Sequence, residues 1–131
     1  MDGKITSVFE PSRKLLVMNG VTEVKKRKTL LALDFFHGSV VEVDIKKDVK
    51  TIVATGLRGA DGIEQASDGT IFVSSFENGA VWRMDENGEN LRRLIGDVGF
   101  QTTADFYLDE PVKRLYVPNT VTGTVLIVST E

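Results

Sequence analysis

Cysteine is absent from the 131-residue chain, and histidine occurs once. Without thiols the chain has no disulfide, no thiolate nucleophile and no cysteine-based metal site. A single histidine also excludes mechanisms that need a histidine pair. A net charge of −3 argues against non-specific nucleic-acid binding, which requires a clustered basic surface. The one basic run, KKRK at 25–28, is interpreted as a solvated turn, with a nuclear-import or polyanion patch as the alternative.

Long apolar runs are also missing, so the sequence has no segment of membrane-spanning length. The first ten residues, MDGKITSVFE, lack the apolar core of a signal peptide. We therefore expect a cytoplasmic protein, unless a signal peptide has been lost from the N-terminus. Hydrophobic residues make up 41% and charged residues 27% of the chain, which is normal for one globular domain.

The sequence does contain one sequence motif, here called the repeated phrase, that occurs three times. Each copy reads as an apolar segment, a polar turn that ends in glycine, and an alternating segment. The copies align without gaps on Gly38, Gly79 and Gly123, at spacings of 41 and 44 residues. They are LLALDFFHGSVVEVD (30–44), IFVSSFENGAVWRMD (71–85) and LYVPNTVTGTVLIVS (115–129). A period of about 40 to 50 residues with several strands in each unit is typical of β-propeller blades.

Gly, Asn and Asp residues divide the chain into short segments that we predict to be strands. No segment has the pattern of an amphipathic helix. The predicted strands are 5–10, 20–24, 30–33, 40–44, 51–54, 62–66, 70–74, 80–84, 90–94, 105–108, 114–117 and 124–129. In a propeller blade four strands, from a at the central channel to d at the rim, form one antiparallel sheet. The predicted fold class is therefore all-β, a β-propeller of three four-stranded blades, which is half of a six-bladed ring.

The order of the predicted strands shifts the blades along the chain. The repeated phrase supplies strands b and c, so the sequence starts on an outer strand and stops before another. This predicts an outer strand of a preceding or partner blade in 1–18, blades in 19–57 and 58–99, and a blade without its outer strand in 100–131. Rings usually have about four to eight blades. We expect either a homodimer that closes a six-bladed ring by exchange of its N-terminal outer strands, or a piece of a longer chain.

Acidic and amide residues recur where the inner strand of each predicted blade begins, at the mouth of the central channel. Asp61 and Asp105 are 44 residues apart, in GADGIEQ and TADFYLD. With one gap, Asn19 aligns with Asp61. Carboxylate and amide oxygens suit hard cations such as Ca²⁺ and Mg²⁺, so we predict a divalent-metal site at Asn19, Asp61 and Asp105. The alternative is that Asn19 and Asp61 are turn residues and that Asp105 only caps or braces the crossover.

Several motifs occur in a characteristic order and spacing along the chain. They are Asn19-Gly20-Val21, Ala60-Asp61-Gly62-Ile63 with SDGTIFV at 67–73, and Ala104-Asp105 followed by KRLYVPN at 113–119. Together they resemble the SMP-30/gluconolactonase/LRE-like family of six-bladed propellers. The resemblance extends over nearly the whole chain, but only over the C-terminal half of a typical member.

The resemblance implies a metal site and a hydrolytic activity. In that family an Asn of a P-N-G motif and an Asp of a P-D-G motif bind a divalent metal, which would give these roles to Asn19 and Asp61. It also makes Asp61 the general base in lactone hydrolysis. Ca²⁺ is the expected metal, with Zn²⁺, Mg²⁺ and Mn²⁺ as alternatives. The chain departs from the pattern because Met18 and Ala60 replace the prolines, and because the family's metal-binding Glu belongs to a blade outside this sequence.

Four further polar residues are candidate substrate contacts. Glu64 follows Asp61 on the predicted inner strand and could line the channel. Asp34, Ser75 and Asn119 share one position at the end of strand b. For these three residues turn chemistry is the first interpretation, and contact with substrate is the second.

Two functions from different classes follow. The first is a metal-dependent hydrolase of lactone or ester small molecules. The second is a non-catalytic propeller that binds a ligand or a partner protein at its mouth, or a truncated fragment without activity. Carboxylates gathered around one mouth repel each other, so an acidic ring formed by two chains predicts a bound cation or a cationic ligand.

Overall fold

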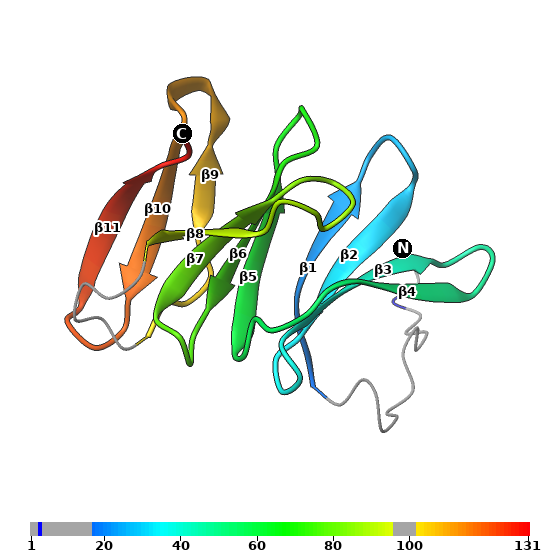
Figure 1. Ribbon diagram of the computed structural model, residues 1–131, viewed down its shortest axis with the longest axis horizontal. Helices are drawn as coiled ribbons and strands as arrows, with labels where there is room; N and C mark the ends of the chain where they lie inside the picture. The colour runs from blue at the N-terminus through cyan, green and yellow to red at the C-terminus, as the bar shows by residue number, and fades with distance from the viewer. Residues whose placement is uncertain (1–2, 4–16, 96–101) are drawn as a thin grey trace.

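The computed structural model describes residue 3 and residues 17–95 and 102–131. Within these ranges eleven β-strands form three antiparallel sheets that follow one another along the longest axis (Figure 1). The strands are β1 (Met18–Val24), β2 (Thr29–Asp34), β3 (Ser39–Asp44), β4 (Val49–Ala54), β5 (Ala60–Gln65), β6 (Ile71–Ser75), β7 (Ala80–Met84), β8 (Arg92–Ile95), β9 (Tyr107–Asp109), β10 (Arg114–Asn119) and β11 (Thr124–Ser129). A single turn of 3-10 helix, η1 (Glu110–Val112), precedes β10. None of the described residues belongs to a helix long and apolar enough to cross a membrane.

The strand order in each sheet follows the chain, as expected for propeller blades. Blade 1 contains β1 to β4, blade 2 contains β5 to β8, and blade 3 contains β9 to β11. The predicted all-β architecture is confirmed, with two four-stranded sheets and a third of three strands. The predicted strand at 5–10 lies outside the described residues. The strand predicted from Asn90 begins later, at Arg92, because the Asp85 side chain accepts hydrogen bonds from the backbone of Asn87 and Glu89 and holds these residues in a turn.

The repeated glycine ends the turn between the second and third strands of every blade. Gly38, Gly79 and Gly123 have φ angles of 65°, 54° and 67°. This left-handed conformation strains any residue that carries a Cβ atom. The N–H of Gly38 donates to the carbonyl of Asp34 at 2.9 Å, and that of Gly123 to the carbonyl of Asn119 at 3.0 Å. The phrase therefore recurs because each hairpin needs a glycine at the same place.

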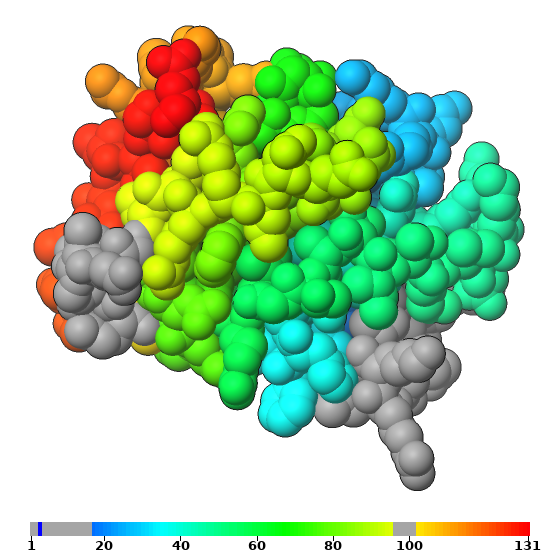
Figure 2. Space-filling view, in the orientation of Figure 1, coloured from blue at the N-terminus to red at the C-terminus, as the bar shows by residue number. Residues whose placement is uncertain are grey.

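Two hydrophobic clusters hold the three blades together. The first joins blade 1 to blade 2 and includes Leu31, Leu33, Val40, Ile71 and Val73. The second joins blade 2 to blade 3 and includes Phe72, Val81, Leu115 and Val117. Alternate residues of β6 point to opposite faces of its sheet, so blade 2 is apolar on both faces. Figure 2 shows the three blades in continuous contact from one end of the molecule to the other.

All three inner strands contain the same irregularity, a one-residue β-bulge. In blade 1 the pairing moves from Met18↔Asp34 to Val21↔Ala32. In blade 2 it moves from Ala60↔Ser75 to Ile63↔Val73. In blade 3 it moves from Thr103↔Asn119 to Tyr107↔Tyr116. In each blade, the inner strand has one residue more than its partner strand between these two pairs. Bulges redirect side chains and are common beside functional sites.

Candidate functional site

Asn19 and Asp61 meet at the bulges of the first two blades. Asn19 lies one residue after Met18 on β1, and Asp61 lies one residue after Ala60 on β5. Asn19 Nδ2 donates a hydrogen bond to Asp61 Oδ1 at 3.0 Å. Neighbouring bulges thus bring together two of the residues that the sequence placed at the channel mouth.

The strand pairing corrects the predicted position of Asp105. The pair Ala60↔Ser75 of blade 2 corresponds to Thr103↔Asn119 of blade 3, so Ala104 occupies the position of Asp61. Asp105 stands instead at the position of Gly62. The 44-residue spacing of the repeated phrase does not apply to the inner strands, because the connection from β9 to β10, which contains η1, is one residue longer than that from β5 to β6.

Asp105 nevertheless lies close to Asp61 and Glu64, because its side chain reaches back to blade 2. These three residues form an acidic cluster. A Cβ atom placed on Gly62 would lie 2.6 Å from Asp105 Oδ1. Burial raises the pKa of Asp61, and the charge of Asp105 raises it further, whereas the hydrogen bond from Asn19 lowers it. Burial and Asp105 also raise the pKa of Glu64. In the described part of the chain, no ion pair neutralises any of these carboxylates.

Glycine next to each of the first two site residues lets adjacent inner strands approach closely. A Cβ atom on Gly20 would lie 2.2 Å from the backbone oxygen of Asp61. The N–H of Gly62 donates to the buried Ser74 Oγ at 2.8 Å, which fixes the second bulge. The two glycines therefore position the acidic cluster by close backbone packing.

The acidic cluster is not a complete metal centre in the described residues. No three His, Cys, Asp or Glu side chains within residues 17–95 and 102–131 lie close enough together to hold a metal ion. Asp61 and Asp105 supply carboxylate oxygens, and the Asn19 amide directs its nitrogen toward Asp61. A hard cation favours six to eight oxygen ligands for Ca²⁺ or six for Mg²⁺. A metal here would need further ligands beyond these three residues.

The three residues that share the end of strand b are buried at the last positions of β2, β6 and β10. Asp34 Oδ1 accepts hydrogen bonds from the N–H groups of Phe36 and His37. Asn119 Oδ1 accepts equivalent bonds from the two residues after Thr120. Ser75 Oγ donates to the carbonyl of Arg58 at 2.6 Å. Asp34 and Asn119 thus bond the turns that follow them, as in the first of the two roles expected, whereas Ser75 bonds the segment that leads into β5. Contact of these three residues with substrate stays a prediction.

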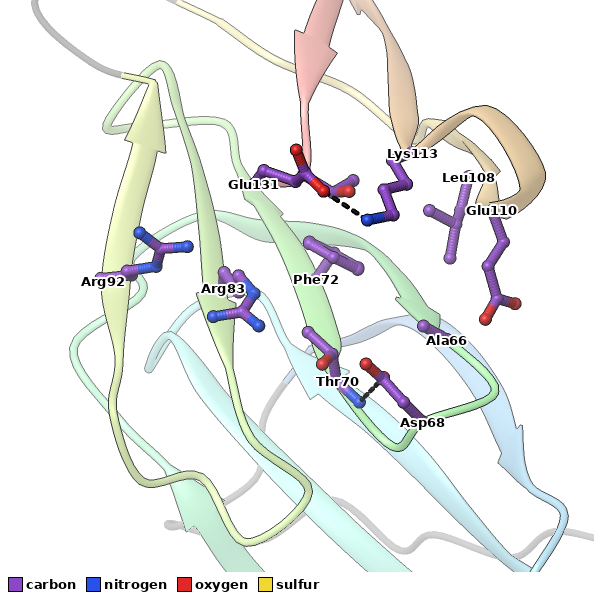
Figure 3. Close-up of a pocket in the computed structure, with 11 residues that line it drawn as sticks. Ala66, Asp68, Thr70, Phe72, Arg83, Arg92, Leu108, Glu110, Lys113 and Glu131 are labelled. Carbon is purple, nitrogen blue, oxygen red and sulfur yellow. Dashed lines mark hydrogen bonds and ion pairs between the residues drawn. The ribbon is translucent and has the colours of Figure 1, made fainter.

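A separate cavity of about 370 Å³ lies between blades 2 and 3. Asp61 lies near the start of β5, whereas the cavity lies past the end of this strand, where Ala66 lines it. Figure 3 shows Arg83 and Arg92 on one wall and the ion pair between Lys113 and Glu131 opposite them. This cavity was not predicted from the sequence. The available signal was a pair of arginines on β7 and β8, but their direct pairing is evident only once the sheet register is known.

The strand order, the inter-blade cores and the aligned inner strands define the class of protein: a β-propeller, of which this chain supplies three blades. Among solved structures, the chain is similar to a chain in the crystal structure of a nidogen/laminin complex, with a TM-score of 0.74 and 15% sequence identity. The match covers 98% of this chain and 53% of that one, so this chain spans about half the length of its structural neighbour. At such identity the similarity shows the fold alone.

No protein-family model matches the sequence, and no curated protein matches it. The propeller fold implied by the resemblance is confirmed, whereas membership of the SMP-30/gluconolactonase/LRE-like family stays a prediction.

Proposed function

We propose that the protein is a non-catalytic binding propeller whose channel mouth takes a positively charged ligand. The ligand is a divalent cation, with Ca²⁺ as first choice, or a basic side chain of a partner protein. The observation that carries this proposal is the cluster of Asp61, Glu64 and Asp105. Two of these carboxyls have raised pKa values, caused by burial and by their acidic neighbour. A bound positive charge would relieve both effects.

The structural neighbour supports a binding role in a limited way. It comes from a complex of nidogen with laminin, so a chain of this fold is present in a protein–protein assembly. Propellers support many functions, and the fold itself does not identify the ligand. Support for a positively charged ligand therefore comes from the carboxylates at the mouth.

Isothermal titration tests the proposal directly. Ca²⁺, Mg²⁺, Zn²⁺ and Mn²⁺ are titrated separately, followed by a short peptide rich in lysine and arginine. We expect at least one of them to bind the wild-type chain, and Asp61→Asn to weaken that binding. Glu89→Gln removes an exposed carboxylate from a distant turn and should leave binding unchanged. If the wild-type protein binds neither metal nor peptide, the proposal is wrong.

A lactone or ester hydrolase is the second candidate function. The observation in its favour is again Asp61, because a raised pKa brings a carboxylate closer to the range of an effective general base. Glu64 would line the path of the substrate. A divalent metal, when bound, would polarise the lactone carbonyl, but the described residues do not complete such a centre. Hydrolysis of a lactone panel that is abolished by EDTA and by Asp61→Asn would favour the enzyme over the binding protein.

We also propose that the protein works as a homodimer in which two chains form one six-bladed ring. In this arrangement the segment at 5–10 of each chain pairs with β11 of the other, which has no outer neighbour among the described strands. Proline removes a backbone donor, and the N–H groups of successive strand residues point to opposite sides. Only one of residues 8 and 9 can direct its N–H group toward the partner strand. One of the two variants Val8→Pro and Phe9→Pro is therefore expected to weaken the dimer. If neither variant does so, strand exchange is wrong.

A further inference from the structure

The outward face of blade 3 is apolar and exposed. Tyr107 of β9, Tyr116 of β10 and Ile127 of β11 form one cross-strand row. The two tyrosine rings stack with their centroids 6.3 Å apart. Val125 lies two residues from Ile127 on the same face, and both are about 60% exposed. This face lies at one end of the row of blades, and blade 1 lies at the other end (Figure 1).

The internal repeat shows what such a face does in the other two blades. Val125 aligns with Val40 of blade 1 and Val81 of blade 2, and both of these valines are fully buried against the next blade. Tyr116 aligns with Leu31 and Phe72, which are 0% and 2% exposed. The same positions thus form the contact with the following blade twice within the chain. In blade 3 they have no such partner in the described structure.

The outward face of blade 1 corresponds to the faces by which blades 2 and 3 contact the blade before them. Val21 corresponds through the bulge register to Ile63 and Phe106, which pack against the preceding blade and are 4% and 6% exposed. Val21 itself is 60% exposed. It begins a cross-strand row that continues through Ala32 and Val41 to Ile52. Ala32 and Val41 are buried in the single chain, so the exposed Val21 and Ile52 are the residues of this row that a second copy would contact.

The two end faces also carry oppositely charged residues at corresponding positions of the repeat. Arg114, which pairs with Asp109 across the strands, lies on the exposed face of blade 3, and Glu23 lies on the outward face of blade 1. Their equivalents at the internal interface are Thr70 of blade 2 and Leu108 of blade 3, which line one cavity. A second chain docked in the same way would bring its Glu23 close to Arg114.

We propose that the outward face of blade 3 binds the outward face of blade 1 of a second copy of this chain, and that two copies joined twice in this way close the ring. This inference specifies the surface used by the homodimer proposed above and rests on it. By the repeat, Asn19 of each copy would lie next to Ala104 of the other chain, the position that Asp61 occupies beside Asn19 within one chain, so the acidic clusters of both chains would face one channel mouth. The channel mouth is therefore complete only in the dimer.

Light scattering after size-exclusion chromatography of the full chain tests the interface. The wild-type chain should have twice the 14.4 kDa mass of one copy. Val125→Asp would bury an unpaired charge at both interfaces and should raise the dimer dissociation constant at least about 100-fold. Val121→Asp is the matched control: Val121 is 59% exposed, and its equivalents Phe36 and Glu77 are exposed in the other blades. A monomeric wild type, or a Val125→Asp variant that remains as dimeric as Val121→Asp, would overturn the proposal.

A charge exchange provides a test that does not depend on folding of the Val125 variant. Glu23→Arg and Arg114→Glu should each weaken the dimer by about 3- to 10-fold, and the double variant should restore it. Absence of restoration would contradict the docking geometry. Asp61→Asn should remain dimeric, so loss of cation binding in a dimeric Asp61→Asn protein and loss of the dimer in Val125→Asp report separately on the mouth and on the interface.

Discussion

Replacing Gly20 by alanine is expected to force the first two blades apart. The added Cβ atom would lie 2.2 Å from the backbone oxygen of Asp61, whereas ordinary contacts begin near 3.4 Å. This oxygen belongs to the chain of β5 and cannot rotate away as a side chain would. One of the two inner strands must therefore shift by about 1 Å. Overpacking of this kind costs about 1–3 kcal/mol, and we expect the upper end because the obstacle is backbone.

Urea unfolding monitored by tryptophan fluorescence and by circular dichroism measures this cost. Gly123→Ala is the control, because it has a φ of +67° and no atom within 4 Å of an added Cβ. It isolates the strain of a left-handed alanine, about 1–2 kcal/mol. Gly20→Ala should lose more free energy of unfolding than this control. It should also weaken cation binding, because the shift disturbs Asn19 and Asp61. Equal or smaller destabilisation than Gly123→Ala would show that the inner strands are not packed this closely.

Three further predictions concern the same region. Folding raises the pKa of Asp61 above its ordinary value of 3.8, so the ionised form destabilises the fold at neutral pH, and this penalty is relieved as the pH falls through the raised pKa. Asp61→Asn should therefore increase the free energy of unfolding near neutral pH and flatten its acid dependence in urea titrations, and a loss of stability at neutral pH would contradict this. Ser74→Ala should cost about 1–3 kcal/mol by leaving the buried N–H of Gly62 without an acceptor; Ser74→Thr retains the hydroxyl and, if it fits, should recover part of the loss. Leu33→Ala should cost about 2–5 kcal/mol, because the fully buried side chain joins blades 1 and 2, and thermal unfolding that is unchanged would exclude that role.

The hairpins of this fold could be predicted from the sequence, whereas the position of the inner strands could not. Strands b and c are recognisable because their alternation and the glycine at Gly38, Gly79 and Gly123 are local properties. The bulge is different, since it exists only in the pairing between two strands. The longer connection before β10 moved Asp105 by one position relative to Asp61, and nothing in the repeated phrase indicates that shift.

The candidate site was predicted in part for the same reason. Asn19 and Asp61 each precede a glycine at the start of an inner strand, and from this pattern we correctly predicted that the two residues lie together; their role as ligands stays a prediction. The role of the glycines in the close approach of the backbones could not be predicted, because it depends on which blade lies next to which. Arg83 and Arg92 were missed because Arg83 is a variable position of the repeated phrase and Arg92 lies outside it. The two become neighbours only through the register of β7 with β8.

If the exposed face of blade 3 binds a second copy as proposed, it also determines which assemblies can form. A surface that fits the opposite end of an identical molecule forms a head-to-tail contact, and such contacts either close or continue into a filament. Which of the two occurs depends on the angle through which one chain turns around the channel axis. Half a turn per chain gives a discrete pair with no free ends, whereas a different angle leaves a free end on every assembly. Small changes in the packing of Gly20 or Gly62 would alter that angle and could convert a closed particle into a growing polymer.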